Sequence, residues 1–102
     1  MSRKVIGIHL VCRGGENVKD IGDGRFKSGY WKISEEVAGN AEYLALHENK
    51  NSPSYIQGTI EGYERIDDGS NRIFFYVRAI SEPKVWVGTA TGEKGYLWSD
   101  DV

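Results

Sequence analysis

Residues 41–48, AEYLALHE, and residues 55–66, YIQGTIEGYERI, are the stretch of this 102-residue chain that decides the fold. In both segments apolar and polar side chains alternate with the period of two that is typical of a β-strand. The residues between them, NKNSPS at 49–54, are polar and include the turn-forming Asn, Ser and Pro. The sequence therefore predicts an antiparallel hairpin at the centre of the chain.

Further strands are predicted on both sides of this hairpin. Residues 4–12 are apolar on both faces, which favours a strand that is buried on both sides. Three more short segments have strand character, at residues 72–79, 84–88 and 95–98. About six short strands without a βαβ rhythm predict a mainly β fold.

The remaining segments are predicted to be a short helix and turns. Ser34 precedes two glutamates, a pattern that predicts a helix start with Ser34 as the N-cap and Gly39 just beyond the end. Residues 13–29 contain five glycines and few apolar side chains, so we expect a long loop or two turns there. Residues 89–94 are expected to form another turn.

These elements predict a single domain over residues 1–102. The expected architecture is a small, strongly bent antiparallel sheet, or a partly open six-stranded barrel, with one or two short helices. The single cysteine, Cys12, cannot form an internal disulfide, and no stretch reaches the length of a membrane span. The apolar run after Lys4 is short and has no small-residue cleavage site, so a cytoplasmic protein without a membrane partner is expected.

Charge is distributed unevenly along the chain, although the net charge is only −2. Residues 1–32 hold seven basic and three acidic side chains, a net charge of +4. Residues 33–102 hold six basic and twelve acidic side chains, a net charge of −6. This balance argues against a uniformly basic protein that wraps a duplex, but it leaves room for a local basic surface.

Motifs of enzymes are largely missing from the sequence. Residues 22–29, GDGRFKSG, resemble a dinucleotide fingerprint, but the third glycine is misplaced and no strand–helix context follows. His9 and His47 are far apart and there is one cysteine, so no metal set is predicted. Cys12 is interpreted as a small buried thiol at a strand end. We therefore expect no cofactor, no metal and no catalytic residues.

Aromatic residues are abundant for so polar a chain, with three Trp and six Tyr. Tyr30 and Trp31 precede the predicted helix, Trp86 stands between valines, and Trp98 lies near the C-terminus. A flat ring can stack on a base or a cation, and it can equally fill the core of a small β domain.

Two segments resemble a known superfamily. Residues 43–60, YLALHENKNSPSYIQGTI, resemble the middle hairpin of PUA-like domains of the EVE type. In that hairpin an apolar strand ending in His or Ser leads through a polar Lys/Pro loop into a strand with a Gly and an aliphatic residue. Residues 28–34, SGYWKIS, are similar to the Gly-x-Trp-x-x-Ser stretch of YTH readers, where the Trp belongs to an aromatic cage.

The resemblance implies a partly open barrel that binds nucleic acid, either DNA or RNA, and reads a modified or flipped-out base in an aromatic pocket. A separate effector protein could work beside such a module. The implied pocket residues are Trp31, Tyr30, Trp86, Ser34, His47, Asn51 and Ser54, and the implied phosphate contacts are Arg25, Lys27, Lys32 and Lys50.

Two other classes of protein remain open at this stage. An ASCH-like ribonuclease would require Lys27 or Lys32, Tyr30 and Glu48 to converge in one cleft. A β-barrel interaction or structural domain would use the Trp residues as core. His47 also suits a strand-end histidine that is hydrogen-bonded to the backbone. A base reader would be favoured by one concave pocket that holds both Trp31 and Trp86.

Overall fold

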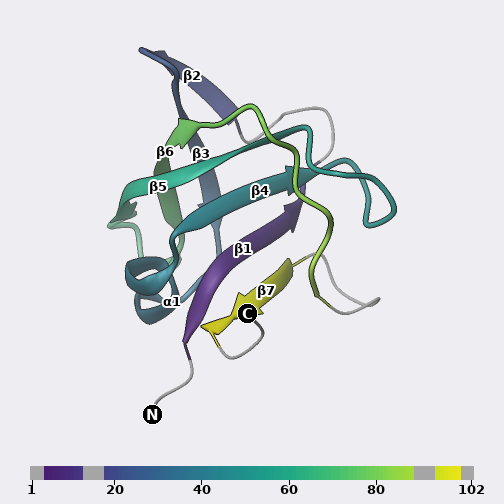
Figure 1. The fold of residues 1–102 in the computed structure, drawn as a ribbon. Coiled ribbons are helices and arrows are strands. Elements are labelled where there is room, and N and C mark those ends of the chain that lie inside the picture. The colour runs from purple at the N-terminus through teal and green to yellow at the C-terminus, as the bar shows by residue number, and fades with distance from the viewer. Residues whose placement is uncertain (1–3, 13–17, 89–93, 100–102) are drawn as a thin grey trace.

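The structure is a computed structural model that describes residues 4–12, 18–88 and 94–99 of the chain (Figure 1). These residues form seven strands and one helix. In chain order they are β1 (Val5–Val11), β2 (Val18–Gly22), β3 (Arg25–Trp31), α1 (Glu35–Asn40), β4 (Tyr43–His47), β5 (Ile56–Arg65), β6 (Ile73–Ala79) and β7 (Lys94–Trp98). The predicted mainly β fold is confirmed.

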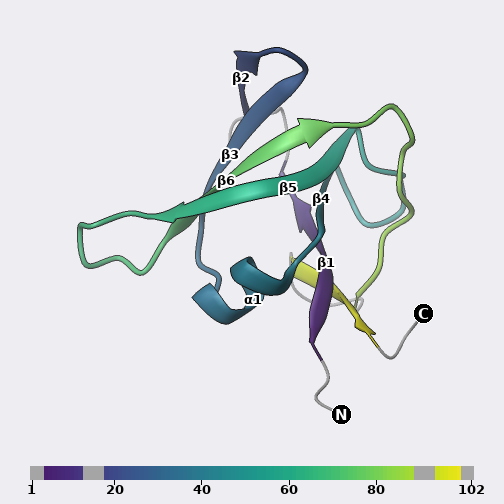
Figure 2. The same cartoon turned by 60° about the vertical axis from the view of Figure 1, so that its left-hand side comes forward.

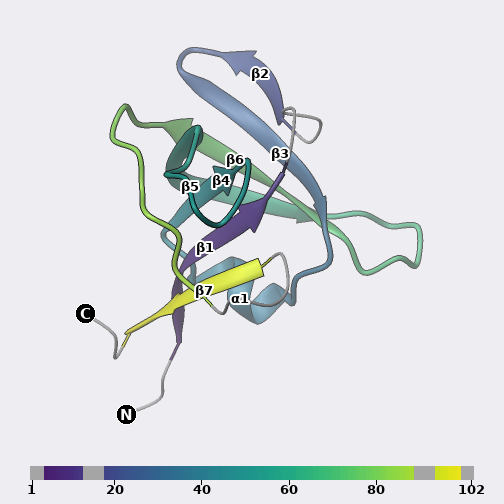
Figure 3. The same ribbon diagram turned by 90° about the vertical axis from the view of Figure 1, so that its right-hand side faces the viewer.

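All seven strands belong to one sheet, in the order β2-β3-β6-β5-β4-β1-β7. β1 pairs with β4 in parallel, and the other pairs are antiparallel. The sheet is therefore mixed, whereas the sequence predicted a small, strongly bent antiparallel sheet or a partly open six-stranded barrel. It remains open between β2 and β7, so it is not closed into a barrel (Figure 3).

The sheet is strongly bent, so that its two halves enclose one core (Figure 2). Leu44 of β4 belongs to the same buried cluster as Phe26 of β3 and Phe75 of β6, although β5 and β6 separate β4 from β3 in the sheet. The helix α1 contacts β1 and β5 and adds Ala38 to this cluster. The face of the sheet turned away from this cluster is called the outer face below.

The central hairpin and the helix form as predicted. β4 and β5 pair antiparallel, with Leu44 opposite Gly58. Ser34 is the N-cap of α1, and its side chain accepts a hydrogen bond from the backbone N–H of Val37. The sequence predicted Gly39 just beyond the end of the helix, but Gly39 lies inside it. In the described part of the chain no helix has the length and apolar character needed to cross a membrane.

The prediction of a long loop or two turns at residues 13–29 is wrong for most of the residues in this range that the structure describes. Residues 18–22 and 25–31 are strands that pair as a hairpin, with Lys19 opposite Lys27. Asp23 and Gly24 connect them with φ angles of 56° and 73°. Two consecutive positive φ values are typical of a type I′ turn, for which Asp-Gly is a preferred pair.

The strand predicted for residues 84–88 is also absent. After β6, residues 80–88 cross the outer face of β4 and β1 without strand structure, and we call them the covering segment (Figure 1). Lys84 is fixed there because its backbone N–H donates to Ser54 Oγ and its carbonyl accepts from Ser54 N, both over 2.8 Å. The last strand, β7, is confirmed, whereas the turn predicted before it lies almost wholly outside the described residues.

Candidate nucleic-acid interface

Basic side chains gather on the outer face because of the strand register. Residues directly opposite each other on neighbouring strands project from the same face of a sheet. Lys19, Lys27 and Tyr76 form one such row across β2, β3 and β6. Arg25 and Arg78 form the next row across β3 and β6.

Three aromatic rings lie next to these cations. The ring of Tyr30 contacts the ring of Phe74 edge to face, with centroids 5.9 Å apart, and Phe74 contacts Tyr76 in the same way at 5.4 Å. The ammonium group of Lys27 lies 3.9 Å from the centre of the Phe74 ring. Tyr30 is 52% exposed, so part of its ring is accessible to a ligand. We call Tyr30, Phe74 and Tyr76 the aromatic row.

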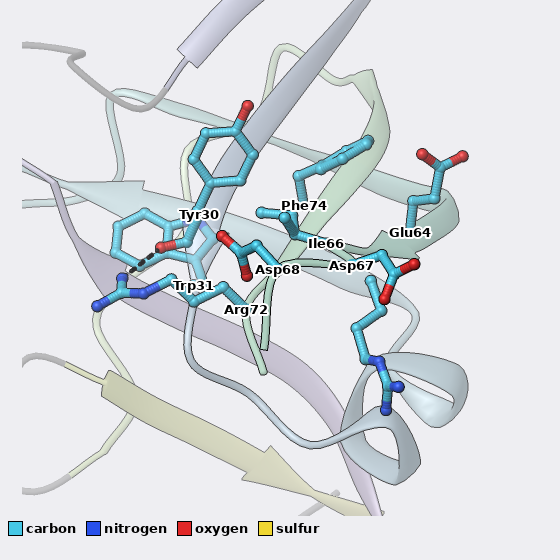
Figure 4. A pocket seen from close by; sticks show the side chains of 9 residues that line it. Tyr30, Trp31, Glu64, Ile66, Asp67, Asp68, Arg72 and Phe74 are labelled. Atoms are coloured by element: carbon cyan, nitrogen blue, oxygen red, sulfur yellow. Dashed lines mark hydrogen bonds between the residues drawn. The ribbon is translucent and has the colours of Figure 1, made fainter. Parts of the chain in front are cut away.

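A pocket of about 950 Å³ adjoins the Tyr30 end of the aromatic row. It lies beside the β5–β6 hairpin, which projects from the body of the molecule (Figure 2). Aromatic, aliphatic and charged side chains share its wall (Figure 4). The lining residues are Tyr30, Trp31, Glu64, Arg65, Ile66, Asp67, Asp68, Arg72 and Phe74.

Trp31 and Tyr30 contribute to this pocket in different ways. Between Ser28 and Trp31 the pairing of β3 with β6 is irregular, so that Trp31 faces Ile73. Trp31 is partly buried against the core, and its Nε1 donates to the buried hydroxyl of Ser28 over 2.9 Å. Trp31 is thus a fixed wall of the pocket, whereas Tyr30 offers the accessible ring.

Arginine side chains at the pocket have different partners. Arg72 donates from Nη1 to the carbonyl oxygen of Tyr30 over 3.1 Å, which fixes its guanidinium at the pocket wall (Figure 4). Arg65 instead forms an ion pair with Glu35 of α1, at 3.2 Å. Arg72 keeps further N–H groups that can bind an anion such as a phosphate.

A second polar cluster lies under the covering segment, on the β1 and β4 part of the outer face. Nδ1 of His9 lies 2.9 Å from Nε2 of His47, and Nε2 of His9 lies 2.8 Å from the hydroxyl of Tyr43. Nδ1 of His47 lies 2.9 Å from the carbonyl oxygen of Ser52. We call Tyr43, His9 and His47 the histidine chain.

The proton positions in the histidine chain follow from the carbonyl at its end. A carbonyl oxygen only accepts, so His47 carries its hydrogen on Nδ1 and accepts at Nε2. His9 therefore donates from Nδ1 to His47 and accepts at Nε2 from the Tyr43 hydroxyl. Both histidines are neutral in this arrangement, and both use their two ring nitrogens within the protein.

Burial keeps these histidines neutral. Both side chains are fully buried, and burial, together with the nearby His47 and Lys84, lowers the pKa of His9 to about 4. Burial also lowers the pKa of His47, although the hydrogen bond to the Ser52 carbonyl opposes this. The chemistry is that of a satisfied buried network and not of an activated acid–base pair.

The covering segment closes over the histidine chain with two side chains. The ring of Trp86 stands edge-on to His47 at 5.2 Å and to His9 at 6.0 Å. The ammonium group of Lys84 lies 4.3 Å from the centre of the Tyr43 ring. Trp86 is thus a lid on the buried histidines, and it is not among the residues that line the pocket beside Tyr30.

The residues predicted to form one site therefore fall into two groups. The first group lies on β3: Tyr30 and Trp31 line the pocket, and Lys27 contacts Phe74 of the aromatic row. Arg25 lies at the opposite end of β3 from this pocket, in the sheet row next to that of Lys27. The second group surrounds the covering segment and the β4–β5 loop, where Lys50 lies 6.0 Å from the centre of the Trp86 ring. That group consists of Trp86, His47, Lys50, Asn51 and Ser54.

The other predicted residues, Ser34 and Lys32, lie outside these two groups. Ser34 caps α1, and the hydroxyl of the buried Ser54 donates to Gln57 and accepts from Lys84. Lys32 follows β3, and its carbonyl accepts a hydrogen bond from Lys94 over 2.7 Å. The cluster of Lys27 or Lys32 with Tyr30 and Glu48, which a ribonuclease would need, does not line this pocket.

Several residues of the interface were not predicted from the sequence. Lys19, Phe74, Tyr76 and Arg78 come together only through the pairing of β2, β3 and β6. The Asp23-Gly24 pair was a usable signal for the β2–β3 hairpin, since Asp-Gly favours a two-residue hairpin turn. Arg78 and Tyr76 lie in a predicted strand, but their face depends on the register.

No metal site is found among the described residues, since they contain no group of three or more His, Cys, Asp or Glu side chains placed to hold an ion. Compared with protein-family models, curated proteins and solved structures, the chain shows no significant match. The resemblance to PUA-like domains therefore stays a prediction.

Proposed function

We propose that this protein is a small nucleic-acid-binding module that binds a single strand across the outer face of β2, β3 and β6. The observation that carries the proposal is the aromatic row beside the cations of two neighbouring sheet rows. Single-stranded nucleic acid is bound by proteins that combine aromatic stacking faces with a basic track for the backbone.

Each part of this surface has a role in the proposal. The exposed ring of Tyr30 stacks on a base, which can enter the adjoining pocket. Lys19, Lys27 and Arg72 bind phosphates, and none of these contacts depends on base identity. The rows across β2, β3 and β6 concentrate positive charge locally, in a chain whose net charge is −2. Such a local patch of charge suits a single strand of nucleic acid that contacts one face of the domain. It suits less well a duplex, which would need a more extended basic surface.

The proposal changes the residues assigned to base recognition. Ser34, His47 and Ser54 receive no base contact, because their side chains already have the partners described above. Trp86 is assigned to the cover of the histidine chain. An interaction domain that binds protein through the same aromatic row is the competing function, because an exposed aromatic ring also suits a protein interface.

The test is a binding titration of the full chain with ten-nucleotide single-stranded RNA and DNA, and with the matching duplexes. At low salt we expect single strands to bind more tightly than duplexes. Tyr30→Ala should weaken single-strand binding by about 5- to 150-fold, which corresponds to the ~1–3 kcal/mol of one stacked base.

Two variants serve as controls. Tyr30→Phe retains the ring and should keep the affinity of the wild type. Val85→Ala shortens the side chain of a residue on the covering segment that is 76% exposed, and it should have no effect. The proposal fails if neither RNA nor DNA binds at low salt, where phosphate contacts are strongest, or if Tyr30→Ala binds like the wild type.

A further inference from the structure

The pocket at the Tyr30 end of the aromatic row combines three kinds of chemical group. Tyr30 offers a ring, Asp68 a carboxylate and Arg72 a guanidinium, all on the wall of one cavity. In Figure 4 the carboxylate of Asp68 points toward the side of the pocket that carries Tyr30 and Trp31. The carboxylates of Glu64 and Asp67 point away from that side. One carboxylate of the pocket wall is thus directed toward the side that carries the stacking ring.

Asp68 is held in place as an ionised acceptor. The backbone N–H of Ser70 donates to Asp68 Oδ1 over 2.9 Å. Hydrogen bonding to Ser70, together with the charge of Arg72, keeps the pKa of Asp68 below its ordinary value. A carboxylate has about four lone-pair sites on its two oxygens, so capacity remains for two further N–H donors.

This acceptor distinguishes among the four bases. A guanine presents N1–H and N2–H side by side on its Watson–Crick edge, and one carboxylate can accept both. Adenine, cytosine and uracil each place an acceptor next to their donor on that edge, and an acceptor facing a carboxylate is repelled. A ring stacked on Tyr30 with its edge toward Asp68 is therefore recognised best when it is guanine.

Arg72 completes the site for a nucleotide. Its Nη1 is bound to the carbonyl oxygen of Tyr30, so the guanidinium stands next to the residue that stacks the base. The planar guanidinium has five N–H groups, and those not used on Tyr30 can bind a phosphate. One pocket thus offers a ring for the face of the base, a carboxylate for its Watson–Crick edge and a guanidinium for the phosphate.

We propose that this pocket selects guanine: the base stacks on Tyr30, its Watson–Crick edge binds Asp68, and its phosphate binds Arg72. The inference rests on the proposed nucleic-acid function and adds the identity of the base to it. It is tested with single nucleotides as well as with oligonucleotides, so that base selection is measured even if the longer ligand fails to bind.

The experiment titrates the full chain with GMP, AMP, CMP and UMP and follows Trp fluorescence and NMR shifts. GMP should bind about 5- to 150-fold more tightly than UMP, the range for one well-placed bidentate contact. Asp68→Asn should abolish that preference, and UMP should bind at least as tightly as to the wild type, because its edge acceptor no longer faces a carboxylate. Arg72→Gln should weaken all four nucleotides alike.

The matched control is Asp67→Asn, since the neighbouring carboxylate points away from the stacking ring (Figure 4). It should keep the preference for GMP. Equal affinities for the four nucleotides, or an equal loss in Asp67→Asn and Asp68→Asn, would overturn the guanine assignment.

Oligonucleotides separate this assignment from the proposed function. If decamers bind with Tyr30 dependence but G-containing and U-only strands bind equally, the nucleic-acid function stands and guanine selection is wrong. If GMP is preferred while no decamer binds, the guanine pocket stands and the nucleic-acid function is wrong. If nothing binds, both are wrong.

Discussion

Arg25 donates its Nε hydrogen to Oε1 of Glu61 over 2.6 Å, although the two residues belong to β3 and β5, which are not neighbours in the sheet. The strand between them, β6, contributes Arg78, which donates to the second carboxylate oxygen over 3.1 Å. Arg25 and Arg78 face each other across neighbouring strands, where like charges repel. Glu61 offsets that repulsion, and the hydrogen bond from Arg25 is the main cause of its lowered pKa.

This arrangement predicts that Glu61→Gln strengthens nucleic-acid binding. The change removes the negative charge between two guanidinium groups, so that both keep an uncompensated positive charge that can attract phosphate. We expect tighter binding of a single-stranded decamer and a steeper dependence of affinity on salt concentration. Fluorescence titrations at several salt concentrations measure both quantities.

The fold should be retained in this variant, because ion pairs between exposed side chains contribute little to stability. Thermal unfolding checks that point. Unchanged or weaker binding by a folded Glu61→Gln variant would show that the Arg25 and Arg78 pair does not contact the nucleic acid.

The buried His9 predicts a loss of stability in mild acid. Its pKa is about 4 in the folded protein, compared with 6.5 for an unperturbed imidazole. Between these values the unfolded chain binds a proton that the folded chain does not, so the free energy of unfolding falls as the pH drops from 6.5 to about 4. The loss from His9 is roughly 3 kcal/mol, and His47 acts in the same direction because its pKa is also lowered.

Urea unfolding at pH 7.5, 6, 5 and 4.5 measures this decline. The variant His9→Gln replaces the imidazole with an amide that can donate and accept but does not titrate, so its stability should depend less on pH over this range. A wild-type stability that is flat from pH 7 to 5 would contradict the assignment of a buried, neutral His9.

Whether a strand could be predicted from the sequence depends on how clearly apolar and polar side chains alternate along it. β4 and β5 alternate clearly and are joined by a short polar loop, so their pairing was visible in the sequence. β2 is an edge strand whose residues are exposed or partly exposed along its whole length, so no apolar face marks it. Without that signal its glycine-rich surroundings favoured a loop, and the β2–β3 hairpin was missed.

The candidate site was predictable by residue type but not by location. One irregularity in β3, between Ser28 and Trp31, separates the inward Trp31 from the exposed Tyr30, and such irregularities leave no pattern in the sequence. The parallel pairing of β1 with β4 brings His9 to His47 over a separation of 38 residues. Only the three-dimensional register shows that Trp31 and Trp86 belong to different clusters.

Gly7 is expected to be intolerant of any side chain. It lies opposite Tyr43, and a Cβ atom at Gly7 would overlap the Tyr43 ring. Gly7→Ala must therefore displace the ring that donates to His9, and it should destabilise the protein by about 1–3 kcal/mol, as overpacking usually does.

A matched substitution at Gly39 should have the opposite effect. This glycine lies in α1, where a Cβ atom would meet only Tyr63, at an ordinary 3.9 Å. Gly39→Ala should stabilise the protein by about 0.5–1 kcal/mol, because alanine loses less backbone entropy in a helix. Denaturant unfolding of both variants tests the pair, and equal effects of the two changes would contradict the close contact at Gly7.

Two of the three lysines that the resemblance implied as phosphate contacts, Lys27 and Lys50, are predicted to behave differently. Lys27 lies 3.9 Å from the centre of the Phe74 ring, within the proposed interface. Lys50 lies in the β4–β5 loop, 6.0 Å from the centre of the Trp86 ring that covers the histidine chain. A single strand of nucleic acid bound along the aromatic row would therefore contact Lys27 but not Lys50.

Lys27→Gln should therefore weaken single-strand binding equally for all sequences and reduce the slope of log affinity against log salt by about 0.7, the value for one phosphate contact. Lys50→Gln removes the same charge and should change neither the slope nor the relative affinity of different sequences. Titrations of both variants from 20 to 200 mM salt, a range of about one decade in which screening rises steeply, compare them directly. Equal slopes for the two variants would mean that the nucleic acid responds to net charge alone and does not follow the aromatic row.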